Sequence, residues 1–172
     1  IYIPYWAFSC EVTSRWSADA GYTHFVEEKT KEGPRRVPRT RWEPCSGMRH
    51  DQHDGHLVCA SLGLHRSDAA SLKAAVHEFE LASLLPYAPE YLLGFAAERY
   101  GVDLNEGWQL ARRSLASTQA GRCASDVPGD THRSLRVSHQ FSDVRFKHVL
   151  LPMWIAAYRY QPTGRVFQFL VN

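Results

Sequence analysis

The feature that most constrains this chain is a regular alternation of apolar and polar residues near both of its ends. In residues 6–15, Trp, Phe, Cys and Val alternate with Ser, Glu, Thr and Arg. Residues 135–141 and 144–148 repeat the same two-residue period. A period of two matches the pleat of a β-strand, whose successive side chains point to opposite faces. These segments therefore predict strands with one buried and one polar face.

Further segments combine β-prone residues with turn residues at their ends. Turn chemistry at 19–21 predicts a break after the first strand, and the turn at 161–164 predicts a hairpin near the end of the chain. Segment 45–55 has no apolar period and predicts a loop, whereas 91–100 is ambiguous and favours a strand. The other predicted strands are 22–27, 35–42, 57–61, 154–160 and 165–171.

Two segments between the strand-rich ends predict helices. Ser67 is placed as an N-cap for a short amphipathic helix at about 68–78. Asp103 is placed as the N-cap of a longer helix at about 104–120, with Gly121 as its stop signal. The predicted buried face of that second helix consists of Leu104, Trp108, Ala111 and Leu115.

This order of elements predicts the fold class. Strands at both ends with helices between them favour a single α+β domain over 1–172, mostly an antiparallel sheet built from the N- and C-terminal hairpins with two helices packed on it. Segments 2–6 and 150–154 each place a Pro two residues before a Trp, which suggests that they lie side by side in that sheet. Four tryptophans are expected to anchor the core: Trp6, Trp16, Trp108 and Trp154.

Composition excludes several classes of protein. The 172 residues are 44% hydrophobic and 22% charged, which is close to the globular average and speaks against disorder. The longest apolar run, 149–158, contains a proline and is about half the length that a membrane-spanning helix requires. A net charge of +2 is too small to indicate a nucleic-acid partner by itself. We expect a cytoplasmic chain that, lacking an initiator Met, is part of a longer protein.

A basic segment within 29–42 is one candidate site. Arginines beside a tryptophan can contact phosphates and stack on a base, or meet anionic lipid head groups. The alternative is an exposed hairpin tip and edge strand whose positive charges discourage association between edges. The candidate residues for an anionic or nucleic-acid partner are Arg35, Arg36, Arg39, Arg41 and Trp42.

A second candidate site is the histidine-rich segment 45–59. Imidazole and thiolate are the ligands that zinc prefers, although these residues match no standard zinc spacing. A solvent-exposed polar loop is the competing interpretation. The candidate zinc ligands are His50, His53, His56, Cys45 and Cys59.

Enzyme signatures are otherwise missing from the sequence. It contains no dinucleotide-binding glycine motif, no phosphate-binding loop, no HExxH and no GxSxG. A cysteine–histidine nucleophilic pair stays open, because its members would meet only in the folded chain. His139 and His148 share the apolar parity of their strands and are expected to be hydrogen-bonded core residues. We assign no catalytic residue and no resident cofactor, with zinc as the single candidate.

Several short motifs together resemble a known family. They are Ile3-Pro4-Tyr5-Trp6-Ala7-Phe8, Arg15-Trp16, Arg41-Trp42-Glu43-Pro44, Gly94-Phe95, Glu98-Arg99-Tyr100, Phe146-Lys147-His148-Val149-Leu150-Leu151-Pro152 and Phe169-Leu170-Val171-Asn172. Nearly the whole chain resembles a bacterial family of zinc-ribbon-containing proteins, whose members are often labelled TFIIB-type zinc ribbon or primosomal-helicase-like. The histidines of segment 45–59 depart from that family's pattern.

The resemblance implies a context for the chain. In that family a four-cysteine zinc ribbon precedes this region, and a membrane-spanning segment sometimes follows it. Some members are encoded beside SPFH-type scaffold and membrane-stress proteins. We therefore expect a non-catalytic interaction or scaffold module, with a protein partner or a second copy of the chain, at the inner face of the membrane. A nucleic-acid-binding module using 29–42 and a zinc-dependent enzyme using 45–59 are the alternatives.

Overall fold

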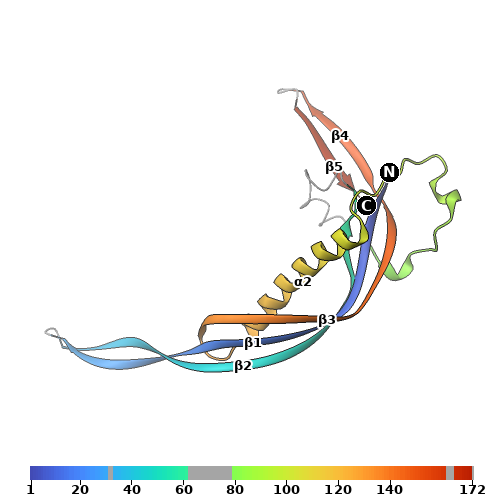
Figure 1. Cartoon of the computed structure of the whole chain (residues 1–172). Helices are drawn as coiled ribbons and strands as arrows, with labels where there is room; N and C mark the ends of the chain where they lie inside the picture. The colour runs from blue at the N-terminus through green and yellow to red at the C-terminus, as the bar shows by residue number, and fades with distance from the viewer. Residues whose placement is uncertain (31–32, 62–78, 162–164, 172) are drawn as a thin grey trace. The chain divides into compact units, whose positions relative to one another are not determined.

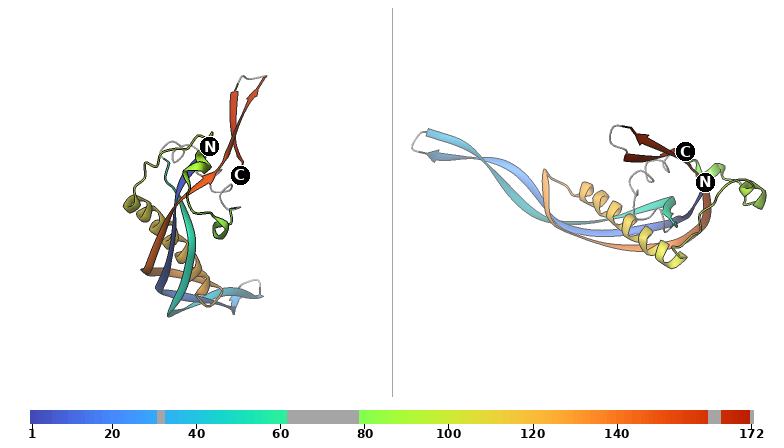
Figure 2. Two further views of the ribbon diagram at one scale, coloured as in Figure 1. Left: turned by 90° about the vertical axis from the view of Figure 1, so that its right-hand side faces the viewer. Right: turned by 90° about the horizontal axis from the view of Figure 1, so that it is seen from above.

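A computed structural model of the chain describes residues 1–30, 33–61, 79–161 and 165–171 (Figure 1). The elements are β1 (Tyr2–Thr30), β2 (Gly33–Cys59), η1 (Leu81–Ser83), η2 (Pro89–Leu92), α2 (Leu104–Asp126), β3 (Thr131–Pro152), β4 (Trp154–Tyr160) and β5 (Arg165–Val171). Strands β1, β2 and β3 form one sheet in the order β2-β1-β3, and β4 and β5 form a second sheet of two strands (Figure 2).

The three-stranded sheet is antiparallel on both sides of its central strand β1. Toward β2, the Thr13 hydroxyl is 2.9 Å from Nδ1 of His50, and the Cys45 thiol donates to the carbonyl of Ala18. Residue numbers therefore decrease along β2 as they increase along β1, so these two strands run antiparallel. Toward β3, the Ser14 hydroxyl lies 2.9 Å from Nδ1 of His139.

The described chain forms two compact units. Unit 1 comprises Ile1–Ser9, His53–Arg112 and Val144–Asn172, and unit 2 comprises Cys10–Gln52 and Arg113–Asp143. Each long strand and helix α2 contribute residues to both units.

In unit 1 the first part of β1 is covered on both faces, each by its own apolar cluster. The odd-numbered face belongs to the cluster Ile3, Tyr5, Ala7, Val149, Leu151 and Met153. The even-numbered face contacts helix α2 through the cluster Phe8, Val58 and Ala111, against which Trp6 and Trp108 pack. Because both faces are buried here, the alternation gives way to a continuous apolar run at 3–8, as expected of a fully covered strand.

Unit 2 keeps the alternation that the sequence shows. Along β1 from Cys10 to Ala20 the even-numbered residues are buried and the odd-numbered residues are at least partly exposed. The buried residues are Cys10, Val12, Ser14, Trp16, Ala18 and Ala20. Helix α2 contributes Leu115, Gln119 and Cys123 to the buried part of the same unit, spaced one helical turn apart. The predicted inward face of residues 6–12 is confirmed.

The predicted turn at 19–21 is wrong, because β1 continues through it to Thr30. Gly21 serves packing here: a Cβ at Gly21 would lie 2.7 Å from Cγ2 of Thr131 and 2.8 Å from Cζ3 of Trp42. The predicted loop at 45–55 is likewise part of a strand, β2. The ring of Trp16 lies so close to Gly47 that it leaves no room for a Cβ at this position.

The predicted fold class is wrong in its helices and in its sheet. Within the described residues the fold is mostly antiparallel sheet with a single α-helix, α2, rather than two helices on an α+β sheet. The other predicted helix, at 68–78, lies outside the described residues. The C-terminal hairpin β4–β5 forms a sheet of its own and does not join the N-terminal strands. The period of apolar residues in a sequence indicates which side chains share a strand face, but it does not indicate which strands pair with each other.

One pairing prediction is confirmed. Segments 2–6 and 150–154 lie side by side, because the amino group of Ile1 donates to the carbonyl of Met153 at 3.0 Å and the Met153 N–H donates back at 2.8 Å. Trp154, however, is 70% exposed, so its prediction as a core anchor is wrong. Trp16 is buried, and Trp6 and Trp108 are partly buried.

Helix α2 begins where the sequence predicts and ends later. The Asp103 carboxylate accepts the N–H of Glu106 at 2.8 Å, which confirms the N-cap. The helix runs past Gly121 to Asp126, because Cys123 is buried and Arg122 and Asp126 form ion pairs within unit 2. Tertiary contacts thus override the glycine stop signal.

Candidate functional site

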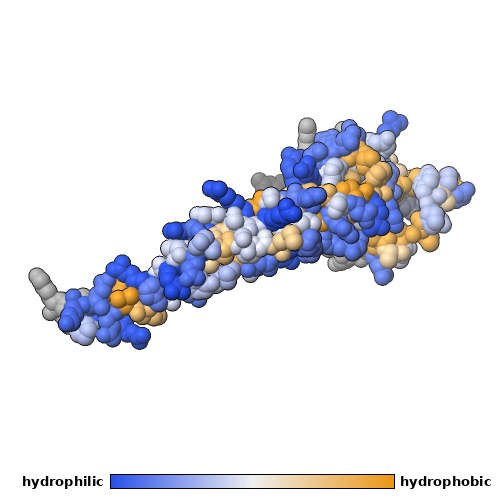
Figure 3. All heavy atoms as spheres, turned by 60° about the horizontal axis from the view of Figure 1, so that its bottom comes forward, coloured by the Kyte–Doolittle hydropathy of each residue, from blue (hydrophilic) through white to orange (hydrophobic). Residues whose placement is uncertain are grey.

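A group of exposed apolar residues is the most prominent surface feature of unit 1. We call it the aromatic surface, and it consists of Leu85, Tyr87, Tyr91, Leu93, Phe95 and Tyr100. Leu85 and Leu93 are 71% and 74% exposed. In Figure 3, apolar residues in orange gather on the face of unit 1 that is in view. Single exposed apolar residues are ordinary, but a contiguous group of them marks an interaction site.

The segment that carries the aromatic surface is irregular but anchored. It contains the two 3₁₀ helices η1 and η2, and Pro86 and Pro89 prevent a longer helix. Past these helices it is held to β1, where the N–H of Tyr2 donates to Ala96 and the N–H of Glu98 donates to Tyr2. The predicted strand at 91–100 is therefore wrong, since only isolated bridges form there.

A groove of about 360 Å³ lies beneath part of the aromatic surface. Its lining comes from the segment Leu84–Leu92, from Tyr2 and from the β3 residues His148–Leu150. The lining is mainly apolar, with tyrosines and one histidine as polar groups. An apolar concavity with a few polar groups is the usual form of a binding site.

Tyr100 belongs to an aromatic cluster beside this groove. The ring of His148 lies 4.7 Å from that of Trp6 and 5.3 Å from that of Tyr100, measured between centroids. The Trp6 indole N–H donates to the carbonyl of Val102 at 2.8 Å, which fixes the indole. Partial desolvation beside these rings lowers the pKa of His148, which favours its neutral form. His148 is exposed and not the core residue that its strand parity suggested.

A second cavity of unit 1, of about 380 Å³, has a mixed lining. Leu81, Leu84 and Phe146 supply apolar groups, and Asp54 and Arg145 supply charge. Phe146 is exposed and lies 6.1 Å from the ring of Trp6. The apolar lining of this cavity therefore continues toward the aromatic cluster.

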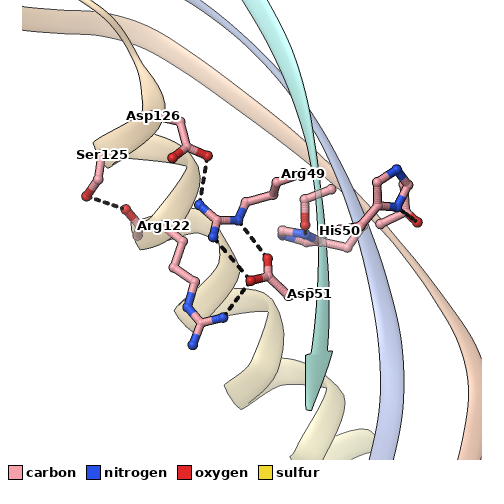
Figure 4. A network of polar contacts seen from close by, with 10 residues as sticks. Arg49, His50, Asp51, Arg122, Ser125 and Asp126 are labelled. Carbon is pink, nitrogen blue, oxygen red and sulfur yellow. Dashed lines mark hydrogen bonds and ion pairs between the residues drawn. The ribbon is translucent and has the colours of Figure 1, made fainter.

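Unit 2 contains an ion-pair network between β2 and α2 (Figure 4). The Arg49 guanidinium donates to Asp51 at 2.6 Å and to Asp126 at 2.7 Å, and Arg122 donates to Asp51 at 2.8 Å. Asp51 is only 13% exposed, and the hydrogen bond from Arg49 holds its pKa at about 2. All four charges are satisfied by one another, which indicates a structural clamp rather than a reactive site.

The basic segment of the sequence analysis lies in unit 2, and two of its arginines pair with carboxylates. Arg39 forms an ion pair with Glu28, and Arg41 pairs with Glu43 at 2.8 Å. Arg36 lies over the ring of Phe25, while Arg133 lies 4.3 Å from the centroid of the Trp42 ring. The fourth arginine, Arg35, is exposed.

The structure does not bring the five candidate zinc ligands together. They lie along strand β2, with Cys45 in unit 2 and Cys59 in unit 1. His50 is 2.9 Å from the Thr13 hydroxyl. His53 and His56 lie further along β2, in unit 1. Within the described residues no group of three or more His, Cys, Asp or Glu side chains could hold a metal ion.

Two described thiols are poorly suited to nucleophilic chemistry. Burial raises the pKa of Cys59, which lies beside Tyr5 and Glu98 in unit 1. Burial also raises the pKa of Cys123 in unit 2. Since the thiolate is the nucleophile, both groups are weakly reactive at pH 7.

The sequence analysis missed the aromatic surface. Its signal was the run of apolar residues between 84 and 95, which is broken by two prolines and follows neither a helical nor a strand period. Without a period such a run has no single face to bury. Exposed apolar residues are the consequence.

Comparison with known proteins adds one similarity. A protein of Bacillus subtilis (strain 168) that bears the name uncharacterized protein YdjG is 24% identical to this chain over 168 residues. The match covers 97% of this chain and 47% of that protein, so the chain spans about half the length of the curated relative it matches. No family model matches the chain, and no solved structure matches it. None of the described helices is long and apolar enough to cross a membrane.

Proposed function

We propose that this chain is a non-catalytic interaction module whose aromatic surface binds an apolar segment of a second protein. The observation that carries the proposal is the group of six large exposed apolar residues in unit 1. Three of them, Leu85, Tyr87 and Tyr91, line the 360 Å³ groove. Leaving such a surface in water is unfavourable by about 25 cal/mol per Å² of apolar area, so covering it supplies a driving force for binding.

The charges around the aromatic surface favour a basic partner. Segment 79–100 carries Glu80, Glu90 and Glu98 against the single cation Arg99. Glu80 and Glu90 are exposed. A partner segment with aliphatic residues flanked by Lys or Arg would complement both the groove and this charge.

The state of the thiols supports a role without catalysis. Cys59 and Cys123 both have raised pKa values, and the ion pairs of Arg49 leave no charged group of that network directed at a substrate. Following the sequence resemblance to zinc-ribbon proteins, we place the partner in an assembly at the inner face of the membrane.

Photo-cross-linking in cells tests the proposal. Benzoylphenylalanine is introduced in the full chain at Tyr87 or Tyr91, which are exposed and aromatic, so the substitution preserves the fold. Arg113, exposed on α2, is the control position. We expect one defined adduct from positions 87 and 91 and none from position 113.

A second variant makes the experiment decisive. Leu85→Asp places a charge at the groove without touching the core, and we expect it to reduce the adduct at least tenfold. An adduct that forms equally from position 113, or one that Leu85→Asp leaves unchanged, contradicts the proposal.

The nucleic-acid alternative is less favoured because Glu28 and Glu43 neutralise Arg39 and Arg41. A salt titration separates the two functions. Binding of DNA or RNA that weakens steeply between 50 and ~200 mM salt would point to the basic segment instead. We expect no such binding from the unmodified chain.

A further inference from the structure

The C-terminal hairpin is a sheet of two strands, and neither outer edge pairs with another strand of the part of the chain that the structure describes. Strands β4 and β5 pair with each other in antiparallel register from Trp154↔Val171 to Tyr160↔Arg165. Within the described residues no third strand joins them. A sheet of only two strands is marginally stable in water, and its open edges are templates for further strands.

The two edges differ in how well they are protected. Charged residues on an edge strand discourage pairing with another chain, and β4 carries Arg159. Strand β5 carries its one charge at its first residue, Arg165, has no charge from Val166 to Val171, and contains no Pro or Gly. Its residues are β-branched, aromatic or aliphatic except for Arg165 at its start and Gln168. Strand β5 therefore has the composition of an edge that accepts another strand.

Strand β5 is also complementary to itself. The sequence Val166-Phe167-Gln168-Phe169-Leu170 reads nearly the same in both directions about Gln168. Antiparallel pairing of two copies about a twofold axis at Gln168 places Phe167 opposite Phe169 and Val166 opposite Leu170. Aromatic and aliphatic residues placed opposite one another stabilise an antiparallel pair. This axis places Arg165 opposite Val171 only at the end of the pair. The same operation on β4 about Ala157 would place Ile155 opposite the charge of Arg159, inside the pair.

We infer that β5 is a homodimerisation edge, at which a second copy of this chain adds its own β5 in antiparallel register about Gln168. The result is a four-stranded sheet in the order β4-β5-β5-β4, with a β4 strand at each edge. Such a twofold interface is closed, because each copy uses its β5 edge and no β5 edge is left for a third copy. This inference is independent of the aromatic surface, which belongs to a different segment of the chain.

Engineered disulfides test the register. In the Gln168→Cys variant the two new cysteines stand opposite each other, with Cα atoms about 4.5–5.5 Å apart, which suits a disulfide. The matched control is Ala157→Cys, at the position on β4 that pairs with Gln168. Its two copies would lie three strand spacings apart, about 14 Å, which is too far to bridge. We expect a covalent dimer under mild oxidation from Gln168→Cys and not from Ala157→Cys, both read against the unmodified chain.

Sedimentation velocity tests the dimer without cross-linking. Gln168→Lys places two like charges opposite each other across the twofold axis, whereas Gln168→Thr keeps a neutral β-forming residue. We expect the unmodified chain and Gln168→Thr to sediment as dimers, and Gln168→Lys to shift to the monomer by at least a tenfold weaker association. Each variant keeps its single partner within the hairpin, Ala157, so monomeric folding is preserved.

Three outcomes overturn the inference. They are a monomer at all concentrations of the unmodified chain, equal cross-linking from Ala157→Cys, and a dimer that Gln168→Lys does not weaken. Cross-linking at Tyr87 and Tyr91 reports the aromatic surface separately, so failure of the dimer and failure of the proposed function give different results.

Discussion

At the scale of single residues, several side chains have roles that their neighbours in space decide. Gly21 and Gly47 resemble turn residues in the sequence, yet both lie within long strands. A Cβ at Gly47 would approach Cζ2 of Trp16 to 2.5 Å, so the glycine makes room for a buried indole. A glycine in a strand often marks such a close approach, but the sequence does not identify the approaching group.

Two glycine substitutions test this reading. Gly47→Ala should destabilise the fold by about 1–3 kcal/mol, because the new methyl group overlaps Trp16. Gly121→Ala is the matched control: it lies inside α2 with nothing within 4 Å, and it should stabilise the fold by up to about 1 kcal/mol. Urea denaturation measures both. Equal effects of the two substitutions would contradict the packing role of Gly47.

The charge of Asp51 should make the stability of unit 2 depend on pH. Hydrogen bonding from Arg49 lowers the pKa of Asp51 from 3.8 to about 2 in the folded chain. A lowered folded pKa stabilises the fold above the unfolded pKa, and this contribution is lost as pH falls from about 4 to 2. Its size is roughly 1–3 kcal/mol.

Asp51→Asn should therefore flatten the stability profile between about pH 2 and 5 while lowering stability at pH 7. Glu11→Gln, an exposed position on β1, is the control and should leave the profile unchanged. Urea midpoints measured across this pH range give the comparison. A profile of Asp51→Asn that parallels the unmodified chain would show that the clamp does not stabilise the fold.

At the scale of elements, local sequence set where α2 begins, and packing set where it ends. Asp103 caps the first turn, as the sequence predicts. Gly121 does not stop the helix, because Arg122 and Asp126 form ion pairs with β2 one turn further on. A cap is a contact between residues three apart, whereas these ion pairs join residues more than seventy positions apart.

Removal of the cap should cost stability in proportion to the lost hydrogen bond. Asp103→Ala should destabilise the fold by about 1 kcal/mol, within a range of 0.5–2. Asp103→Asn keeps an oxygen that accepts the Glu106 N–H, so its effect should be smaller. Thermal unfolding followed by circular dichroism measures both variants. If Asn proves as harmful as Ala, the carboxylate stabilises the fold by other means.

At the scale of the whole molecule, apolar clusters and ion pairs hold the described parts of the fold together. Its apolar clusters lie on both faces of β1 in unit 1, and the described residues include no group of side chains that could hold an ion. The histidines of segment 45–59 lie along one strand and not around a centre. The stability of the two units should therefore come from burial and ion pairs.

A chelator should leave the chain folded. We expect the urea midpoint of this chain to be the same, within error, with and without excess EDTA, because no described cluster loses a ligand. Zinc analysis of protein prepared without added metal provides the companion measurement. If the protein contained stoichiometric zinc and its urea midpoint fell when EDTA was added, the histidines would be supported as zinc ligands.

The sequence by itself determined what depends on neighbours along the chain. The two-residue period of 6–15 and 135–141 fixed which side chains share a strand face, and Asp103 fixed the start of α2, because both follow from backbone geometry over a few residues. Only the tertiary structure decided which faces are covered. It extended β1 and β2 through Gly21 and Gly47, left Trp154 in solvent and exposed the aromatic surface, because coverage depends on groups far away in the sequence.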